Sequence, residues 1–173
     1  PTLLPMFLNN FIKKYPKIKL IIEEHNTEEI ITRLKNGHLD AAIAATPLED
    51  EKIKEIVLYY EPFVAYFPES HHSFHKEEIE VEDIDVDSLL LLQDGHCFRD
   101  GILNLCKNVN NSESSTFQIE SGSFETLIKL ADEGLGTTLL PYLHTLDLKE
   151  KDKLKLRHFK EPKPAREVSL IFP

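Results

Sequence analysis

Residues 88–106 read Ser-Leu-Leu-Leu-Leu-Gln-Asp-Gly-His-Cys-Phe-Arg-Asp-Gly-Ile-Leu-Asn-Leu-Cys, and this segment indicates the fold most directly. Its first five residues, a serine followed by four leucines, form a run that is typical of a buried strand. Asp94 and Gly95 are residue types of turns and helix N-caps, and apolar residues then recur at helical spacing as far as Cys106. A strand that leads through a short turn into a helix predicts an α/β protein, whose sites lie at the carboxyl ends of strands.

The same segment contains both cysteines of the chain, Cys97 and Cys106, nine positions apart. If the segment is helical, a rise of 1.5 Å per residue separates the two Cα atoms by about 13 Å. A disulfide requires Cα atoms within roughly 4.4 to 6.8 Å. A disulfide between these cysteines therefore requires the helix to unfold.

The surroundings of Cys97 favour a reactive thiol. The predicted helix starts just before it, so Cys97 falls in the first turn, where the helix dipole favours a thiolate. His96 and Arg99 can supply positive charge or hydrogen bonds. Asp100 opposes them, but it can also pair with Arg99 and hold its orientation.

Cys106 precedes a polar run, residues 108–115, which predicts a loop that allows this cysteine to move. A second interpretation remains open, because free cysteines are usually small buried apolar residues. Cys106 lies on the same predicted helix face as Ile102, as a core residue would. The nine-residue spacing is not one that predicts a zinc site.

Composition predicts a soluble globular protein. The chain has 173 residues, 41% of them hydrophobic, and no apolar run long enough to span a membrane. It begins at Pro1 without the pattern of a secretory signal. Two cysteines do not form a disulfide scaffold, so we expect a reducing, cytoplasmic setting.

The net charge of −10, from 30 acidic and 20 basic residues, predicts that this chain by itself repels nucleic acid. No run rich in lysine and arginine offers a basic patch. If the protein binds DNA, we expect another segment to contact it.

The first half of the chain alternates helices and strands. Apolar residues at helical spacing over residues 3–12 are followed by an alternating strand pattern over 18–22. Thr27 is predicted to cap a helix that ends at Gly37, and residues 40–45 form a short apolar strand. This order predicts a parallel α/β sheet.

The second half repeats that order. Two strand-like stretches between Ile56 and Phe67 meet at Pro62, and a polar segment, residues 69–87, follows. Ser123 is predicted to cap a helix that ends at Gly134. Further strands are predicted over residues 116–120, 137–140, 154–159 and 167–172. Two units of similar plan predict two lobes with a cleft between them.

Several motifs together resemble one family along the whole chain: Leu3-Leu4-Pro5, Tyr15-Pro16-Lys17-Ile18-Lys19-Leu20, Gly37-x-Leu39-Asp40-x-x-Ile43, Gly134-x-Gly136 and Leu139-Leu140-Pro141. They resemble the effector-binding domain of LysR-type transcriptional regulators. The heptapeptide Asp94 to Asp100, followed by Cys106, is similar to the peroxide-sensing members of that family.

The resemblance implies an α/β fold of two Rossmann-like subdomains, the type II periplasmic-binding-protein-like fold. Residues 1–66 and 166–173 are expected to form subdomain I, without its first strand and last helix. Residues 67–165 are expected to form subdomain II, which carries the cysteines.

The resemblance also implies a chemistry for the cysteines. Cys97 is expected to react with peroxide, and Cys106 to resolve the resulting sulfenic acid as a disulfide. His96 or the hydroxyl of Thr27 is implied as a hydrogen-bond donor to the departing hydroxide. Arg166 is implied to lie near Cys97, although an arginine that only closes the turn after Pro164 fits the sequence as well; Thr27 likewise suits a plain helix cap.

Further partners follow from the resemblance. We expect hydrogen peroxide as the stimulus, and DNA contact only through a winged helix-turn-helix domain absent from this chain. We also expect self-association to a dimer or tetramer, a thiol-disulfide reductant for reset, and no cofactor, metal or membrane. The protein is then a sensor and not an enzyme.

Two rival functions remain open. One is a thiol peroxidase-like enzyme that uses the same cysteine pair. The other is a domain that binds a small organic effector in the interlobe cleft, where Thr27 and Ser123 could hold a carboxylate. His71, His72 and His75 suggest a metal site, but their polar segment favours an exposed loop.

Overall fold

The computed structural model describes residues 2–93, 97–106 and 120–173, and of Cys97, Glu120 and Ser121 it describes the backbone alone. The helices are α1 (Leu3–Lys14), α2 (Thr27–Lys35), α3 (Cys97–Cys106), α4 (Phe124–Asp132), α5 (Tyr142–Thr145) and α6 (Glu150–Lys153). Two 3-10 helices are η1 (Val81–Asp83) and η2 (Val86–Ser88). The strands are β1 (Ala42–Thr46), β2 (Lys54–Tyr66), β3 (Glu78–Ile79), β4 (Leu91–Leu92), β5 (Glu120–Ser121), β6 (Thr138–Pro141), β7 (Leu156–Phe159) and β8 (Ala165–Phe172).

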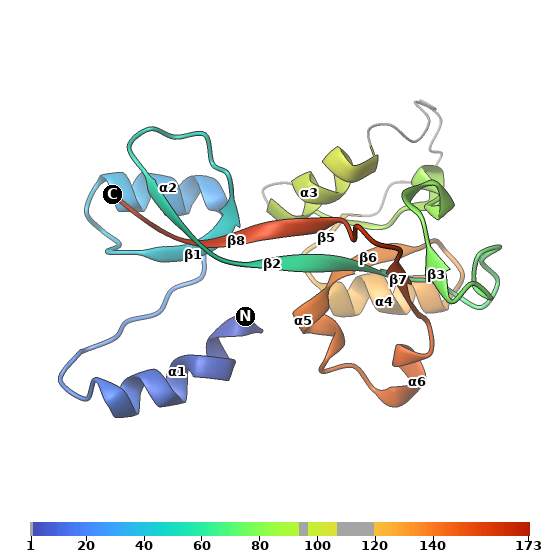
Figure 1. Ribbon diagram of the computed structural model, residues 1–173, viewed down its shortest axis with the longest axis horizontal. Coiled ribbons are helices and arrows are strands. Elements are labelled where there is room, and N and C mark those ends of the chain that lie inside the picture. The colour runs from blue at the N-terminus through green and yellow to red at the C-terminus, as the bar shows by residue number, and fades with distance from the viewer. Residues whose placement is uncertain (1, 94–96, 107–119) are drawn as a thin grey trace.

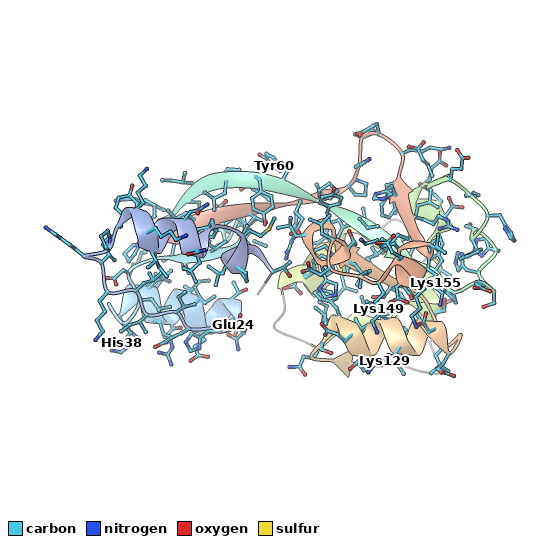
Figure 2. The ribbon with its side chains drawn as sticks, turned by 90° about the horizontal axis from the view of Figure 1, so that it is seen from below. Glu24, His38, Tyr60, Lys129, Lys149 and Lys155 are labelled. Atoms are coloured by element: carbon cyan, nitrogen blue, oxygen red, sulfur yellow. The ribbon has the colours of Figure 1, made fainter. Side chains whose placement is uncertain are left out.

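Two long antiparallel strands, β2 and β8, connect two lobes of the molecule (Figure 1). The main sheet has the order β1-β8-β2-β7-β3, and β6 pairs with β2 as well. Seen from below, Tyr60 lies on the stretch of β2 that runs between the lobes (Figure 2). Both connections between the lobes are therefore hydrogen-bonded strands.

Two separate clusters of buried side chains form the cores. The smaller contains Leu34 from α2, Ala44, Ile53 and Ile171. The larger gathers the buried residues of β2, β4, α3, α4, β6 and β7, among them Phe63, Tyr66, Ile102 and Leu139. Since Phe63 already packs in the larger cluster, β2 enters the second lobe before residue 67; the division of the chain at residues 66 and 67 stays a prediction.

The helix predicted near the N-terminus is confirmed, but the strand predicted after it is wrong. α1 ends at Lys14, before Pro16, and has no buried residue. Residues 18–22 form no strand, and their isoleucine and leucine side chains are exposed. A strand exists only where a neighbour pairs with it, and in the described part of the chain β1 pairs with β8 alone.

α2 begins one residue earlier than its predicted cap suggests. Asn26 is the N-cap, because its side chain accepts a hydrogen bond from the backbone N–H of Glu29 at 2.9 Å. Thr27 is therefore the first helical residue and not the cap. Asparagine and threonine both accept this bond, and the backbone geometry at Asn26 decides between them. The predicted stop is confirmed, since Gly37 adopts φ +69° after the helix.

The prediction of a parallel sheet is wrong for most pairs. β8 inserts between β1 and β2 and runs antiparallel to both. Parallel pairing occurs between β3 and β7, between β4 and β5, and at the single bridge from Leu89 to Thr137. β2 is also one strand rather than two, because Pro62 pairs with Ala165 without breaking it.

The strand that precedes α3 is shorter than the apolar run of residues 88–92 predicts. β4 contains only Leu91 and Leu92, and β5 (Glu120–Ser121) pairs beside it; residues 116–119 of the predicted strand 116–120 lie outside the described residues. The predicted cap of α4 is confirmed, since Ser123 accepts from the N–H of Thr126 at 3.3 Å. In the described ranges, no helix is long and apolar enough to cross a bilayer.

Candidate functional site

Helix α3 carries one cysteine at each end, as predicted from the sequence. It begins at Cys97 and ends at Cys106. Phe98, Ile102 and Cys106 face the larger core and are at most 5% exposed. With a rise of 1.5 Å per residue, the helix separates the two Cα atoms by about 13 Å.

Cys106 is a free, buried thiol. Burial raises its pKa, because the low-polarity surroundings disfavour a thiolate. Cys106 in this position is therefore a protonated, weak nucleophile.

Arg99 connects the first turn of α3 to the end of β4. It is only 8% exposed, and its Nη1 donates to the carbonyl oxygen of Leu92 at 2.8 Å. Asp100, the next residue, is exposed. Arg99, one of the predicted site residues, therefore helps to hold the first turn of α3 against the end of β4. His96 lies outside the described residues.

Arg166 pairs with Glu61, which sequence reasoning missed. Its Nε and Nη2 both donate to Oε2 of Glu61, at 2.9 and 2.7 Å. Glu61 is only 2% exposed, and its Oε1 accepts from the N–H of Leu143 at 3.0 Å. The one sequence signal was an acidic residue inside an apolar strand, where an ionised side chain needs a partner.

Arg166 also contacts the helix that carries the cysteines. Its guanidinium lies over the ring of Phe98, with Cζ 4.9 Å from the ring centroid. Phe98 in turn packs against Phe63 and Phe124, each at 5.2 Å between centroids. The structure therefore brings Arg166 beside the residue that follows Cys97.

Thr27 belongs to a different element from these residues. It is half-buried at the start of α2, in the lobe of the smaller cluster. Within the described residues, no hydrogen bond joins it to Arg99, Asp100 or Arg166.

The three histidines of the polar segment do not gather around one point. His71 stacks on Phe67 at 3.9 Å between centroids and lies against His72, whereas His75 packs on Phe74. In residues 2–93, 97–106 and 120–173, no group of three or more potential ligands could hold a metal ion.

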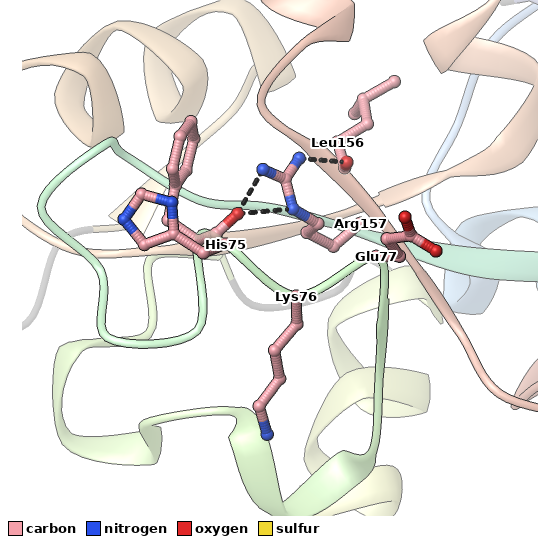
Figure 3. Close-up of a pocket in the computed structure, with 6 residues that line it drawn as sticks. His75, Lys76, Glu77, Leu156 and Arg157 are labelled. Carbon is pink, nitrogen blue, oxygen red and sulfur yellow. Dashed lines mark hydrogen bonds between the residues drawn. The ribbon is translucent and has the colours of Figure 1, made fainter.

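A shallow hollow of about 470 Å³ lies beside this segment (Figure 3). Its lining includes His75, Lys76, Glu77 and Arg157. Arg157 already donates to the backbone carbonyl groups of Phe74, Leu154 and Leu156. These bonds stabilise the loop, so the hollow offers little free hydrogen-bonding capacity from this arginine.

The fold of two lobes joined by paired strands agrees with the comparison to protein families. The whole chain, residues 1–173, matches the LysR substrate binding domain. The chain therefore belongs to the family of LysR substrate-binding domains, and its fold is the periplasmic-binding-protein-like fold that the motifs implied. Relatives in this family are transcriptional regulators and not enzymes.

Two named relatives show which members of the family this chain resembles. A probable hydrogen peroxide-inducible genes activator of Mycobacterium leprae is 34% identical over 99% of this chain and 55% of its own length. The DNA-binding transcriptional dual regulator OxyR of Escherichia coli is 30% identical over 99% of this chain and 56% of its own. The chain thus spans about half the length of these relatives.

Solved structures lead to the same branch. The reduced regulatory domain of OxyR from Pseudomonas aeruginosa matches with a TM-score of 0.83 and 32% identity, over 99% of this chain and 82% of that chain. A Corynebacterium glutamicum OxyR mutant with bound H₂O₂ matches with a TM-score of 0.85 and 30% identity, over 99% of this chain and 54% of that chain.

Proposed function

We propose that this chain is the peroxide-sensing regulatory domain of a LysR-type transcription regulator. The observation that carries the proposal is α3, which has a cysteine at its first residue and a buried cysteine at its last. The relatives named as hydrogen peroxide-inducible activators support the same function.

The first step is attack of the Cys97 thiolate on one peroxide oxygen. The O–O bond breaks, Cys97 becomes a sulfenic acid, and hydroxide leaves with the electron pair. The helix start favours the thiolate through its dipole. His96 or Thr27 serves as the donor to the departing hydroxide.

The second step joins the cysteines. The thiol of Cys106 attacks the sulfenic sulfur, a disulfide forms, and water leaves. Because Cys106 is buried at the far end of α3, the helix must unfold first. Oxidation is in this way coupled to a change of shape, as a switch requires.

Arg99, Asp100 and Arg166 support the reactive turn in this proposal. Arg99 holds the turn to Leu92, and exposed Asp100 moderates the positive charge around it. Arg166 acts through its contact with Phe98, since two of its donors are directed to Glu61.

The wider function follows the family. We assign residues 1–66 with 166–173 to regulatory subdomain I and residues 67–165 to subdomain II, with the last residues of β2 already packed in the core of the second lobe. The domain self-associates as a dimer or tetramer in the cytoplasm, DNA is bound by a separate domain, and a thiol-disulfide reductant resets the switch. The interpretation as a thiol peroxidase-like enzyme is not supported for a member of a family of regulators.

The test is intact mass with thiol labelling after stoichiometric hydrogen peroxide. The protein is expected to lose about 2 Da and both free thiols as the disulfide forms. Cys106→Ser is the matched control, and it is expected to gain about 16 Da at Cys97 and stop there.

Thiols that stay unreactive in both proteins, two in the parent and one in Cys106→Ser, would contradict the proposal. The effector-binding alternative would then be tested by thermal shift across a panel of small organic acids. Ser123→Ala and Thr27→Val would remove the hydroxyl groups that could donate hydrogen bonds to a carboxylate of the ligand.

A further inference from the structure

Among the described residues, Glu61 is the most deeply buried acidic side chain, and the proposed chemistry does not use it. It lies on β2 where this strand passes between the two lobes, and it is 2% exposed. A buried carboxylate is costly unless charged and hydrogen-bonding partners surround it. Its partners therefore indicate what the side chain is for.

Those partners come from two other elements. Arg166 on β8 donates twice to Oε2, and the first turn of α5 donates once to Oε1 through the N–H of Leu143. A planar guanidinium held by two bonds on one oxygen has a restricted orientation. Glu61 thereby determines where the face of the Arg166 guanidinium lies.

The guanidinium carbon of Arg166 lies over the ring of Phe98, 4.9 Å from its centroid. Phe98 is the second residue of α3 and follows Cys97 directly. The ring of Phe98 also packs against the rings of Phe63 and Phe124, each at 5.2 Å between centroids. The first turn of α3 is thus packed against a cation whose position a residue on another strand sets.

We propose that Glu61 is a positioning residue for Cys97: it orients Arg166 against Phe98 and so fixes the first turn of α3 on the two connecting strands. This inference rests on the proposed peroxide-sensing function. Loss of Glu61 leaves Arg166 without its anchor, the turn moves more freely, and the thiolate spends less time in the geometry that reacts.

The test measures the rate at which Cys97 reacts, as a function of pH. Glu61→Gln and Phe98→Leu are compared with the parent protein by peptide mass, with hydrogen peroxide and separately with iodoacetamide. We expect the rate at high pH, where the thiol is fully ionised, to fall about fivefold in both variants. Hydrogen exchange of the α3 amides should rise relative to that of the α4 amides.

Asp132→Asn is the matched control. Asp132 is an acidic residue on α4 that accepts from Lys155 and from the hydroxyl of Tyr66, at 2.6 and 2.7 Å. Its loss is expected to lower stability without changing the limiting rate at Cys97. If Glu61→Gln does not fold, the test uses Phe98→Leu alone. This variant removes the contact with Arg166 but leaves Glu61 and Arg166 paired with each other.

An unchanged or higher limiting rate in both variants would overturn the proposal, whether or not the midpoint of the pH profile or the melting temperature changes. A shifted midpoint alone would mean that Glu61 acts only through its charge. If Cys97 reacts with iodoacetamide but not with peroxide, the proposed function fails, and the iodoacetamide comparison still decides the role of Glu61.

Discussion

A Cβ atom at Gly136 would lie 2.1 Å from the carbonyl oxygen of Ser88. The same oxygen accepts the N–H of Thr137 at 3.0 Å, and the carbonyl of Thr137 accepts the N–H of Leu90 at 2.7 Å. The close approach therefore aligns the chain before β6 with the chain that leads to α3. Glycine is required here for lack of space and not for an unusual backbone angle.

Gly136→Ala is expected to lower the free energy of unfolding by more than about 3 kcal/mol, since backbone atoms cannot give way as a flexible side chain can. Urea unfolding followed by circular dichroism measures this. Gly134→Ala is the control: its φ is +76° and its Cβ would meet nothing within 4 Å, so only backbone strain of about 1 to 2 kcal/mol is expected. Equal losses in the two variants would contradict the steric explanation.

Neighbouring threonines should respond in opposite directions to removal of the hydroxyl group. Among the described residues, the buried Oγ1 of Thr137 has no hydrogen-bond partner. Thr137→Val is therefore expected to leave the free energy of unfolding unchanged or to raise it by up to about 1 kcal/mol. Thr138 donates to the carbonyl of Leu90 at 3.0 Å, so Thr138→Val should lower it by about 1 kcal/mol. Calorimetry of both variants checks the difference in sign.

Asp83 is expected to make stability depend on pH. Burial alone would raise its pKa, but hydrogen bonds from the N–H of Glu80, from Lys76 and from Ser73 outweigh that effect and lower it. The stabilisation is therefore present above the pKa of the unfolded state, about 3.9, and disappears as pH falls through the lower pKa of the folded state.

Asp83→Asn should lower the free energy of unfolding by about 1 to 3 kcal/mol at neutral pH, and by progressively less in acid. Urea unfolding at a series of pH values measures the difference. Exposed Glu82→Gln is the control and should change little at any pH. A loss at Asp83 that is the same in acid as at neutral pH would refute the assigned ionic role.

Gly101→Ala is expected to slow disulfide formation without changing the first oxidation of Cys97. Alanine stabilises the helical state of α3 by up to about 1 kcal/mol, and this helix must unfold before the cysteines meet. The added Cβ would lie 3.1 Å from Cζ of Phe63, and this tight contact offsets part of the stabilisation of the helix. Stopped-flow measurement in the parent and in a Phe63→Leu background separates the two effects, with greater slowing expected in the latter. Equal rates of disulfide formation with and without Gly101→Ala in that background would contradict this prediction.

Local patterns predicted the helices well. Three kinds of local signal were read correctly: the apolar spacing of residues 3–12, the Ser123 cap and the helix stops at Gly37 and Gly134. Each depends on interactions between residues at most four positions apart, so the local sequence is enough to predict it. The same holds for α3, because the local spacing alone places a cysteine near each of its ends. The family motifs then led to the correct family.

Strands and ion pairs were predicted less well. Residues 18–22 alternate as a strand does, yet no neighbour in the described chain pairs with them. Pro62 suggested a break, but β8 supports β2 through it. Strand order in the sheet depends on pairing between distant segments, and periodicity within one segment carries no information about the partner.

The sequence by itself determined that a helix holds Cys97 and Cys106 too far apart to bond, because helical rise depends only on local spacing. Only the tertiary structure decided that Arg166 pairs with Glu61 and lies on Phe98. Glu61 and Arg166 are 105 positions apart, and they meet because they are directly opposite partners on the antiparallel strands β2 and β8. The charged pair beside the first turn of α3 is thus a property of the folded sheet, where burial makes each ionised side chain depend on a partner from another strand.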